Sequence, residues 1–446
     1  MKPNSLYLSI SHALWRLMDS PRSTPHGNRR LRRSVAMLLI LVLAASNMLV
    51  LLPACAEVHT IIVPDDFATI STAVEHAGEG DTVYVKSGTY EINETLNINK
   101  TISLIGEDAA TTLLVGPGIT GWLFSPQVAI EVNADNFKIS QVTINNCDVG
   151  ISVSGEGTEV SNTIMSRSDV SGSHSLISNN TITGLLTVTG SYQTITGNNF
   201  AAGLDLNGSF CSITENTMAY DIYLQGDSNT IKGNNFPTMF LEYADSNIIS
   251  NNSFTCLWVG FMGHACSNNA VFENIAKGPY IWGILMVTGS QNVFHDNYIA
   301  DYVGDNDGYG IAIGGTNLVA ENNIFYHNTL VNNSKSVGYN WALEGSGNVW
   351  DNGKEGNYWS DYNGTDANGD KIGDTPYIID EKNIDHYPLM SPLIAPPTPL
   401  PSPQPQPEQE PFPFASIAVA VLVIIAIAGV ILLVYRSKHI AAKSVQ

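Results

Sequence analysis

The sequence predicts an all-β protein, a right-handed parallel β-helix solenoid with a short N-terminal capping helix, followed by a C-terminal transmembrane helix. Three observations support this fold class. An 18-residue repeat runs through the middle of the chain. A short amphipathic segment precedes the first repeats, and an uncharged, mostly aliphatic segment lies near the C-terminus. Repeats of about 20 residues are typical of solenoids, and an apolar run of about 20 residues is long enough to span a bilayer.

The repeat is marked by an asparagine that returns every 18 residues. These residues are Asn162, Asn180, Asn198, Asn216, Asn234 and Asn252. Other columns keep phase with them. Six residues after each asparagine stand Ser168, Leu186, Leu204, Ile222, Phe240 and Trp258, which we expect to point inward. Fifteen residues after them stand Ile177, Ile195, Ile213, Ile231 and Ile249. The short β-branched runs between Gly, Asn and Ser indicate strands and tight bends.

In a parallel β-helix each coil stacks on the previous one at about 4.8 Å, so equivalent residues form ladders along the axis. Asparagine tolerates the left-handed conformation of a sharp bend, and stacked amides can hydrogen-bond between coils. A glycine column, Gly172, Gly190, Gly208 and Gly226, suits a second corner that leaves no room for a side chain. We therefore interpret the asparagine repeat as architecture rather than as a ligand site.

The segment Ala68 to Ala77 predicts the capping helix. Ile70, Ala73 and Val74 fall on one side of it, together with Ala77. A helix in this place would cover the open end of the first coil, where strand edges are otherwise exposed.

Two motifs at the ends of the repeat region resemble a known family. "VPDDFATISTAVEHAGEGDTVYVKSGTY" occupies 63–90, and "GNYWSDYNGTDANGDKIGDTPYIIDEKNIDHYPL" occupies 356–389. Both resemble the NosD-type proteins, right-handed β-helix proteins of the pectate-lyase-like superfamily. The resemblance covers roughly 60–390. It implies a copper-binding accessory protein, although relatives with a proline stalk and a C-terminal anchor look more like surface carbohydrate-binding proteins.

The two ends of the chain predict membrane targeting. Residues 1–56 form an N-terminal hydrophobic segment, where "RRLRR", an apolar run and "ACAE" are typical of a signal peptide cleaved before Glu57. A retained anchor and a lipobox at Cys55 are alternatives. The β-helix ectodomain is expected at 57–391, a proline-rich stalk at 392–413, a transmembrane helix at 414–436 and a cytoplasmic tail at 437–446. Arg436, Lys438 and Lys443 indicate a cytoplasmic C-terminus and an outward-facing ectodomain.

The predicted ectodomain is strongly acidic. Residues 57–392 contain 10 Lys and Arg against 38 Asp and Glu, a net charge of −28. Such a surface repels nucleic acid and argues against a lyase that cleaves polyanions, since Arg167 is the single arginine in this range. Cys256 and Cys266 could form a disulfide in an oxidising compartment.

Metal chemistry has two candidates. In "DANGDKIGD", the residues Asp366, Asn368, Asp370 and Asp374 stand at the odd-numbered spacing of an oxygen-rich loop, which predicts a structural Ca²⁺ site, or else a polar loop without an ion. Copper, which the family resemblance implies, prefers clustered His, Met or Cys. His264, His295 and His327 share no repeat column, so the residues support copper poorly.

A carbohydrate site is predicted on the outward face of two successive coils. Asp205 and Asp221 would lie one coil and two residues apart, about 8 Å, a separation that suits an inverting glycoside hydrolase. Binding without catalysis is favoured, with Tyr223, Gln225, Asn207 and Tyr243 as ligand residues. Trp341, Trp350 and Trp359 could also stack on sugars, but a buried cap over the last coil is the preferred interpretation.

Glu242 does not fit the repeat, because in register it would be buried beside leucines at high cost. A one-residue slip after Pro237 would instead bury Met239, Leu241 and Tyr243. The sequence thus predicts a cell-surface, membrane-anchored β-helix that binds a polysaccharide, a cell-surface glycoprotein or another envelope partner. A polysaccharide-acting hydrolase, lyase or epimerase and a copper-binding accessory protein are the alternatives.

Overall fold

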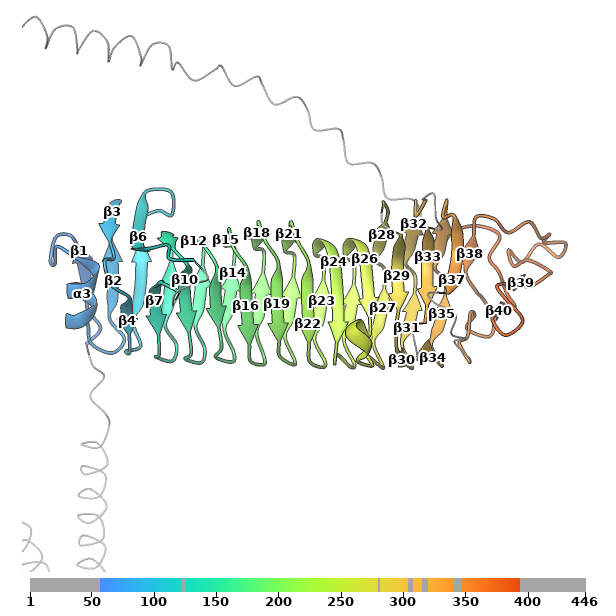
Figure 1. Ribbon diagram of the computed structural model, residues 1–446, viewed down its shortest axis with the longest axis horizontal. Coiled ribbons are helices and arrows are strands. Elements are labelled where there is room, and N and C mark those ends of the chain that lie inside the picture. The colour runs from blue at the N-terminus through green and yellow to red at the C-terminus, as the bar shows by residue number, and fades with distance from the viewer. Residues whose placement is uncertain are drawn as a thin grey trace, which may run out of the picture. The chain divides into compact units, whose positions relative to one another are not determined.

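The computed structural model describes residues 57–121, 126–279, 281–303, 308–314, 320–339 and 347–393 (Figure 1). The predicted signal segment, transmembrane helix and cytoplasmic tail lie outside these residues, as does the predicted stalk except at its first two positions. Within the described part of the chain, no helix is long and apolar enough to cross a membrane.

The described residues form a parallel β-solenoid whose coils each contribute strands to three faces (Figure 1). One face is a 13-stranded parallel sheet, here the first sheet. Its strands, in spatial order, are β1 (Thr60–Val63), β2 (Thr82–Val85), β5 (Ser103–Gly106), β8 (Lys138–Ser140), β11 (Glu159–Ser161), β14 (Leu176–Ser178), β17 (Thr194–Thr196), β20 (Ser212–Thr214), β23 (Thr230–Lys232), β25 (Ile248–Ser250), β27 (Ala270–Phe272), β31 (Val293–His295) and β35 (Ile324–Tyr326).

The other two faces belong to one 23-stranded sheet. One row of it contains β3 (Gly88–Glu91), β6 (Thr112–Gly118), β9 (Thr143–Cys147), β12 (Ile164–Met165), β15 (Thr181–Ile182), β18 (Asn199–Phe200), β21 (Thr217–Met218), β24 (Asn235–Glu242), β26 (Ser253–Val259), β28 (Ile275–Lys277), β32 (Tyr298–Ala300), β36 (Thr329–Val331) and β38 (Tyr358–Trp359). The second row contains β4 (Leu96–Ile98), β7 (Val128–Val132), β10 (Val149–Val153), β13 (Ser168–Val170), β16 (Leu186–Thr189), β19 (Leu204–Asn207), β22 (Ile222–Gln225), β29 (Trp282–Met286), β33 (Tyr309–Ile313) and β37 (Lys335–Tyr339). Strands β24 and β26 run through the corner and belong to both rows.

Two small sheets and two short helices complete the described elements. They are β30 (Gly289–Ser290) with β34 (Ala320–Glu321), antiparallel β39 (Tyr377–Ile378) with β40 (Ile384–Asp385), helix α3 (Ile70–His76) and the 3-10 turn η1 (Phe261–Gly263).

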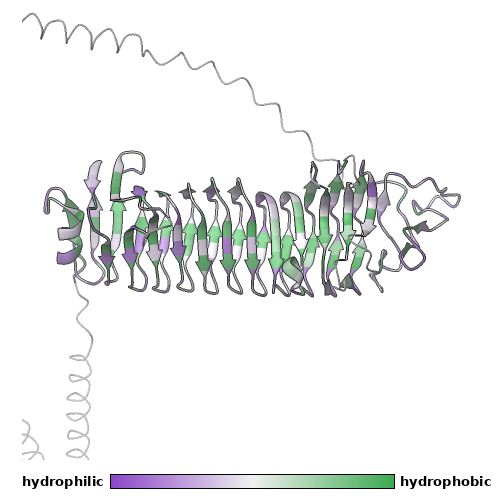
Figure 2. Ribbon diagram, viewed as in Figure 1, coloured by the Kyte–Doolittle hydropathy of each residue, from purple (hydrophilic) through white to green (hydrophobic). Residues whose placement is uncertain are grey.

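The interior of the solenoid is built from files of equivalent apolar residues. Ile177, Ile195, Ile213, Ile231 and Ile249 pair in register and are at most 1% exposed, so the predicted interior file is confirmed. Figure 2 shows that hydrophobic residues follow the strands from coil to coil. The alternation of buried and outward residues along each short strand is what allows a single 18-residue coil to bury one face.

A ladder of buried asparagines joins the coils at the corner after the first sheet. In each coil of the ladder after the first, the side-chain oxygen of the asparagine accepts two hydrogen bonds. Their donors are the backbone N–H and the side-chain amide of the ladder asparagine in the preceding coil. Asn198, for example, donates both bonds to Asn216 Oδ1 at 2.9 Å. The ladder runs through Asn180, Asn198, Asn216, Asn234, Asn252, Asn274, Asn297, Asn328 and Asn357.

Two details of this corner differ from the prediction. The left-handed residue is the one before the ladder asparagine, such as Asn179 (φ 55°) or Glu215 (φ 57°), because the asparagine itself must turn its amide inward. Asn162 is also not in the ladder. Met165, rather than Ile164, aligns with Ile182, so Thr163 takes the ladder position and donates its backbone N–H to Asn180 Oδ1.

A second ladder, which the sequence analysis missed, occupies the corner before the first sheet. It starts with Ser175, Gln193 and Cys211 and continues with Asn229, Asn247, Asn269, Asn292, Asn323 and Asn348. The glycine column lies just ahead of this corner. A Cβ at Gly172, Gly208 or Gly226 would overlap a carbonyl oxygen of the preceding coil, so the predicted lack of space is confirmed.

The predicted capping helix is present as α3. Ile70, Ala73 and Val74 are buried, and the Thr69 side chain caps the helix by accepting the N–H of Thr72. The helix contacts β1 and β2 at the N-terminal end of the solenoid (Figure 1).

The C-terminal end is closed by residues of the second sequence motif. Asp385 is fully buried and replaces the next ladder asparagine: it accepts hydrogen bonds from Asn357 N (2.7 Å), Trp359 Nε1 (2.8 Å) and Tyr387 N (3.0 Å). A Cβ at Gly356 would overlap this carboxylate, which explains that glycine. Burial raises the pKa of Asp385 to about 6.

Other predictions for buried groups have mixed outcomes. Trp350 and Trp359 are at most 1% exposed, so their interpretation as a buried cap is confirmed, while Trp341 lies outside the described residues. The suggested disulfide is not formed, because Cys256 and Cys266 are both free and buried in the core.

Removing one amide from the asparagine ladder should destabilise the solenoid strongly. We expect Asn216→Ala to lower the free energy of unfolding by roughly 2–4 kcal/mol, since Asn198 would lose the acceptor of two buried donors. Denaturant unfolding followed by circular dichroism measures the change. Exposed Asn199→Ala, one position from the ladder, is the matched control and should change stability by less than about 0.5 kcal/mol. Equal effects of the two variants would contradict the ladder's role.

The pKa of Asp385 predicts a pH dependence of the C-terminal cap. A carboxyl whose pKa is raised on folding binds more protons in the folded state than in the unfolded state. Its contribution to the free energy of unfolding therefore falls as the pH rises from about 4 to about 6. We expect this loss to be on the order of 3 kcal/mol. Unfolding free energies of the wild type and of Asp385→Asn, measured from pH 4 to pH 7, isolate the contribution. Parallel curves for the two proteins would show that Asp385 does not titrate in this range.

Candidate functional site

The outward side of the second row carries the predicted site. Leu204 and Leu206 point into the core, and Asp205 between them points outward. In register, Asp205 pairs with Tyr223 of the next coil. The same outward file continues with Phe240 and Trp258 in the two coils that follow.

The predicted one-residue slip is confirmed, because Ile222 pairs with Met239 rather than with Phe240. Met239 and Leu241 are fully buried, as expected from the slip. Tyr243 is not buried but 58% exposed, and Ala244 is buried instead. The slip also corrects the inward column: Phe240 and Trp258 face outward, and Met239 and Leu257 take the interior positions.

These outward rings form a cluster that we call the aromatic row: Tyr223, Phe240, Trp258, Phe261 and Trp282. Tyr223 stacks on Phe240 with ring centroids 4.7 Å apart. Phe261 reaches over from η1 and contacts Phe240 at 4.5 Å, and Trp282 packs its edge on Trp258 at 5.5 Å. An outward cluster of five aromatic rings on a β-sheet face is an apolar surface that favours an interaction partner.

The aromatic row ends at Tyr223, and this end is the best candidate for a binding site. Phe240 stacks on the Tyr223 ring on one side, while the equivalent position on the other side holds the short side chain of Asp205. Tyr223 is 41% exposed. We call Tyr223, Asp205 and Asp221 together the Tyr223 site. Its geometry offers an apolar ring beside two carboxylates.

Both carboxylates of the Tyr223 site are partly buried. Burial raises the pKa of Asp205, and the positive charge of Arg167 opposes that rise. Burial also raises the pKa of Asp221, whose carboxylate accepts hydrogen bonds from Thr238 that act in the other direction. The pKa of Tyr223 is raised by burial and by the charges of Asp221 and Asp205, so both carboxylates lie within electrostatic reach of Tyr223.

The other predicted ligand residues lie beside this site rather than in it. Asn207 pairs with Gln225, and Gln225 donates a hydrogen bond to Glu242 at 2.8 Å. Glu242 Oε1 also contacts His264 Nε2 at 3.2 Å, and these two partners explain how the misfit carboxylate is accommodated. The Tyr243 ring stacks on His264 at 3.8 Å and does not share the file of Tyr223.

The predicted calcium loop is held by its own hydrogen bonds. Asp366 Oδ1 accepts from Gly369 N, Asp370 Oδ1 from Ile372 N, Asp374 Oδ2 from Ala367 N, and Asn368 Nδ2 donates to Asp370 Oδ2. No group of three or more His, Cys, Asp and Glu side chains among the described residues is arranged to hold a metal ion. Structural Ca²⁺ at Asp366, Asn368, Asp370 and Asp374 stays a prediction.

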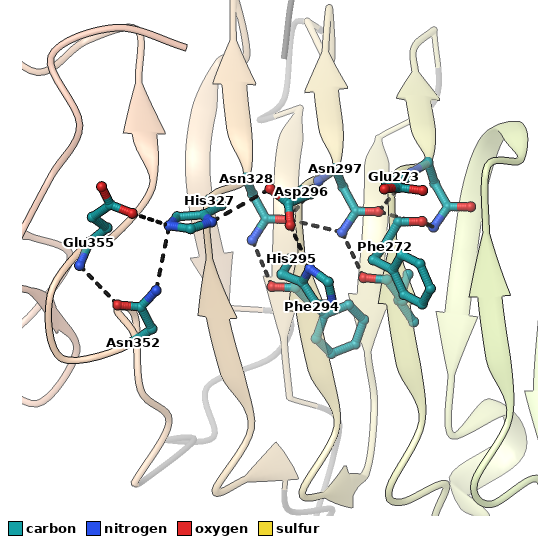
Figure 3. Close-up of polar contacts among 12 residues, drawn as sticks. Phe272, Glu273, Phe294, His295, Asp296, Asn297, His327, Asn328, Asn352 and Glu355 are labelled. Carbon is teal, nitrogen blue, oxygen red and sulfur yellow. Dashed lines mark hydrogen bonds and ion pairs between the residues drawn. The ribbon is translucent and has the colours of Figure 1, made fainter. Parts of the chain in front are cut away.

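Two of the histidines that are scattered in sequence meet at the corner of the first asparagine ladder (Figure 3). His295 Nδ1 lies 2.6 Å from Asp296 Oδ2, and His327 Nδ1 lies 3.6 Å from Asp296 Oδ1. His327 Nε2 bonds Glu355 of the C-terminal cap at 2.8 Å. These contacts form a line along the solenoid that ties the last coils to the cap, and they engage both ring nitrogens of His327.

Comparison with known protein families gives a match for the central and C-terminal coils. A family model described as periplasmic copper-binding protein (NosD) matches residues 203–364. This segment is similar to the NosD family. The match begins just before Asp205 and ends inside the C-terminal motif, so it includes the whole Tyr223 site. The N-terminal motif at 63–90 lies outside it. A search of curated proteins found no match.

Several solved structures are similar to this chain at low sequence identity. The mannuronan C-5 epimerase AlgE6 A-module of Azotobacter vinelandii is 12% identical with a TM-score of 0.45, covering 62% of this chain and 91% of that chain. The Dettilon tailspike protein is 14% identical with a TM-score of 0.47, covering 65% and 68%. The catalytic domain of a GH87 alpha-1,3-glucanase is 12% identical with a TM-score of 0.48, covering 69% and 70%.

The electrostatics of the Tyr223 site can be tested through Arg167. Because its positive charge stabilises the ionised form of Asp205, we expect Arg167→Gln to raise the pKa of Asp205 further above its ordinary value. Carboxyl ¹³C NMR titration of aspartate-labelled protein measures the change. Lys138→Gln, which removes an exposed cation paired with Glu159, is the control and should leave Asp205 unchanged. A fall in the Asp205 pKa in Arg167→Gln would contradict this placement.

Proposed function

We propose that the protein is a cell-surface, membrane-anchored β-solenoid that binds a carbohydrate at the Tyr223 site. The observation that supports this most directly is the half-exposed Tyr223 ring at the end of the aromatic row, with Asp205 and Asp221 beside it. The partner is a polysaccharide or a cell-surface glycoprotein.

The chemistry of sugars matches both parts of the site. A pyranose ring has an apolar C–H face that packs on an aromatic ring through apolar contact. Its hydroxyl groups donate hydrogen bonds, and carboxylates are acceptors that bind donors more strongly than neutral groups do. Tyr223 would hold the ring face, while Asp205 and Asp221 would orient the hydroxyl groups.

The anchor is part of the same proposal. Twenty-one uncharged, mostly aliphatic residues at 415–435 would span about 31 Å as a helix, and basic residues follow them. The proline-rich segment at 392–413 would act as a semi-rigid spacer that holds the solenoid away from the bilayer.

An enzyme acting on a polysaccharide is the second candidate, favoured by the raised pKa values of Asp205 and Asp221. A carboxyl with a raised pKa can act as a general acid, and a second carboxylate can activate water. Product analysis by mass spectrometry in the binding experiments below distinguishes this candidate. Cleavage that is lost in Asp205→Asn or Asp221→Asn would replace the binding-only function.

Copper handling is the third candidate, and it is supported by the description of the matching family model. His295 and His327 are the described histidines that come together, and carboxylates already contact their rings. Titration of the metal-free full-length protein with copper tests this candidate, and sub-micromolar affinity would favour it over carbohydrate binding.

The binding function is tested by removing the Tyr223 ring. We expect Tyr223→Ala to weaken binding of the full-length protein to its glycan by about ten-fold or more, equivalent to about 1.4 kcal/mol, because the apolar contact is lost. Binding is measured on a glycan array and then by calorimetry on the oligosaccharides that bind.

Tyr387→Ala is the matched control. Tyr387 is 38% exposed, close to the value for Tyr223, but it lies in the C-terminal cap and donates its backbone N–H to Asp385 without using its ring. Equal affinities of Tyr223→Ala and Tyr387→Ala would contradict the Tyr223 site, and an array with no bound glycan would contradict carbohydrate binding.

A further inference from the structure

We infer that the sugar bound at the Tyr223 site carries a free ammonium group, as in a glucosamine polymer, rather than a carboxylate. The inference rests on the proposed carbohydrate function and specifies its ligand class. It is based on the charged side chains around Tyr223 and on the partner that each of these side chains contacts.

Two of the charged groups near the site are the carboxylates beside Tyr223. Glu242, on the next strand, has its own partners, because it contacts His264 Nε2 at 3.2 Å and accepts a hydrogen bond from Gln225 at 2.8 Å. Arg167, whose charge reaches Asp205, is itself paired with Asp169 at 3.5 Å. Among the described residues, neither Asp205 nor Asp221 forms an ion pair. Asp205 lies opposite Tyr223 in the register of the neighbouring strands, and the charges of both carboxylates raise the pKa of Tyr223.

The surroundings strengthen this local field. Residues 57–392 carry a net charge of −28, so the solenoid attracts cations and repels anions over distances comparable to the Debye length. Partial burial of Asp205 and Asp221 makes their charges less screened by water than those of fully exposed carboxylates.

An ammonium group satisfies the site in two ways. It is a compact cation with three donors, which matches two carboxylates that accept hydrogen bonds. It is also attracted to the face of an aromatic ring, and the Tyr223 ring lies beside both carboxylates. A uronate in the same place would set like charges against each other and lose the hydration of its own carboxylate.

Calorimetry with three oligosaccharides of equal length tests the ligand class. The probes are a glucosamine tetramer at a pH where its amines are protonated, the N-acetylglucosamine tetramer and a galacturonate tetramer, each titrated into the full-length protein in detergent. We expect the glucosamine tetramer to bind at least about ten-fold more tightly than the acetylated tetramer, and the galacturonate tetramer not to bind.

Two double variants separate the site from the general acidity of the protein. Asp205→Asn with Asp221→Asn should reduce the preference for the glucosamine tetramer over the acetylated tetramer to about two-fold or less. Glu91→Gln with Glu94→Gln removes two exposed charges at the N-terminal end of the solenoid and should keep the full preference.

The possible outcomes are distinct. Tighter binding of the acetylated or galacturonate tetramer would overturn the ammonium inference while leaving carbohydrate binding in place. Equal loss of preference in both double variants would also overturn it, because bulk charge rather than the Tyr223 site would then select the ligand. Failure of all sugars to bind, here and on the glycan array, would overturn the proposed function itself.

Discussion

The asparagine ladder is the interaction on which the rest of the structure depends. At the corner after the first sheet, the chain must turn within two or three residues, and its polar groups are buried there. An asparagine amide meets this need because one end accepts the bonds of the preceding coil and the other end donates to a carbonyl. Asn216, for instance, accepts from Asn198 and donates to Ile195 O at 2.9 Å. From Asn180 to Asn357, each coil is thereby held in one register against the next.

The register between coils determines which side chains of the repeat lie next to one another on each face of the solenoid. Once Ile195 must lie over Ile213, the outward neighbours of these residues are also fixed, and a side chain on one coil has a known neighbour on the next. The Tyr223 site is a consequence of this rule. Tyr223 lies against Phe240 and above Asp205 because the ladders leave the strands no freedom to slide.

Much of this architecture could be predicted from the sequence, because an 18-residue period is visible in apolar and asparagine columns alike. The second ladder could not be recognised as readily, since Gln193 and Cys211 stand where later coils have asparagine. The position of Asn162 was also predicted wrongly. The coil that begins there is one residue shorter than 18, so Thr163 takes the ladder position and donates its backbone N–H to Asn180, although Asn162 and Asn180 are 18 residues apart. Column spacing predicts that coils stack, but it cannot say which of two adjacent residues turns inward.

The candidate site was harder to predict for the same reason. Phe240 and Trp258 fall in an inward column by simple counting, and the slip near Pro237 turns them outward next to Tyr223. Phe261 comes from η1, a turn outside the repeat, so no period could place it over Phe240. The alignment of Asp205 with Tyr223 follows the predicted columns, because both residues precede the slip. The raised pKa values of Asp205 and Asp221 depend on burial, which only the packed coils reveal.

The positions that the repeat constrains, and those that it leaves free, also indicate where a ligand site can lie in this fold. The two ladders, the left-handed corner residues and the interior files use up most positions of an 18-residue coil. The C-terminal motif is architectural in the same sense, since Gly356, Asn357 and Trp359 serve to seat Asp385 at the end of the ladder. A motif of this kind identifies a solenoid and says little about its ligand. Specificity must come from outward positions that no ladder constrains, and at Tyr223 these positions place an aromatic ring beside two carboxylates. Because the surrounding solenoid is acidic, such a site selects its ligand by charge as well as by the shape of the sugar ring.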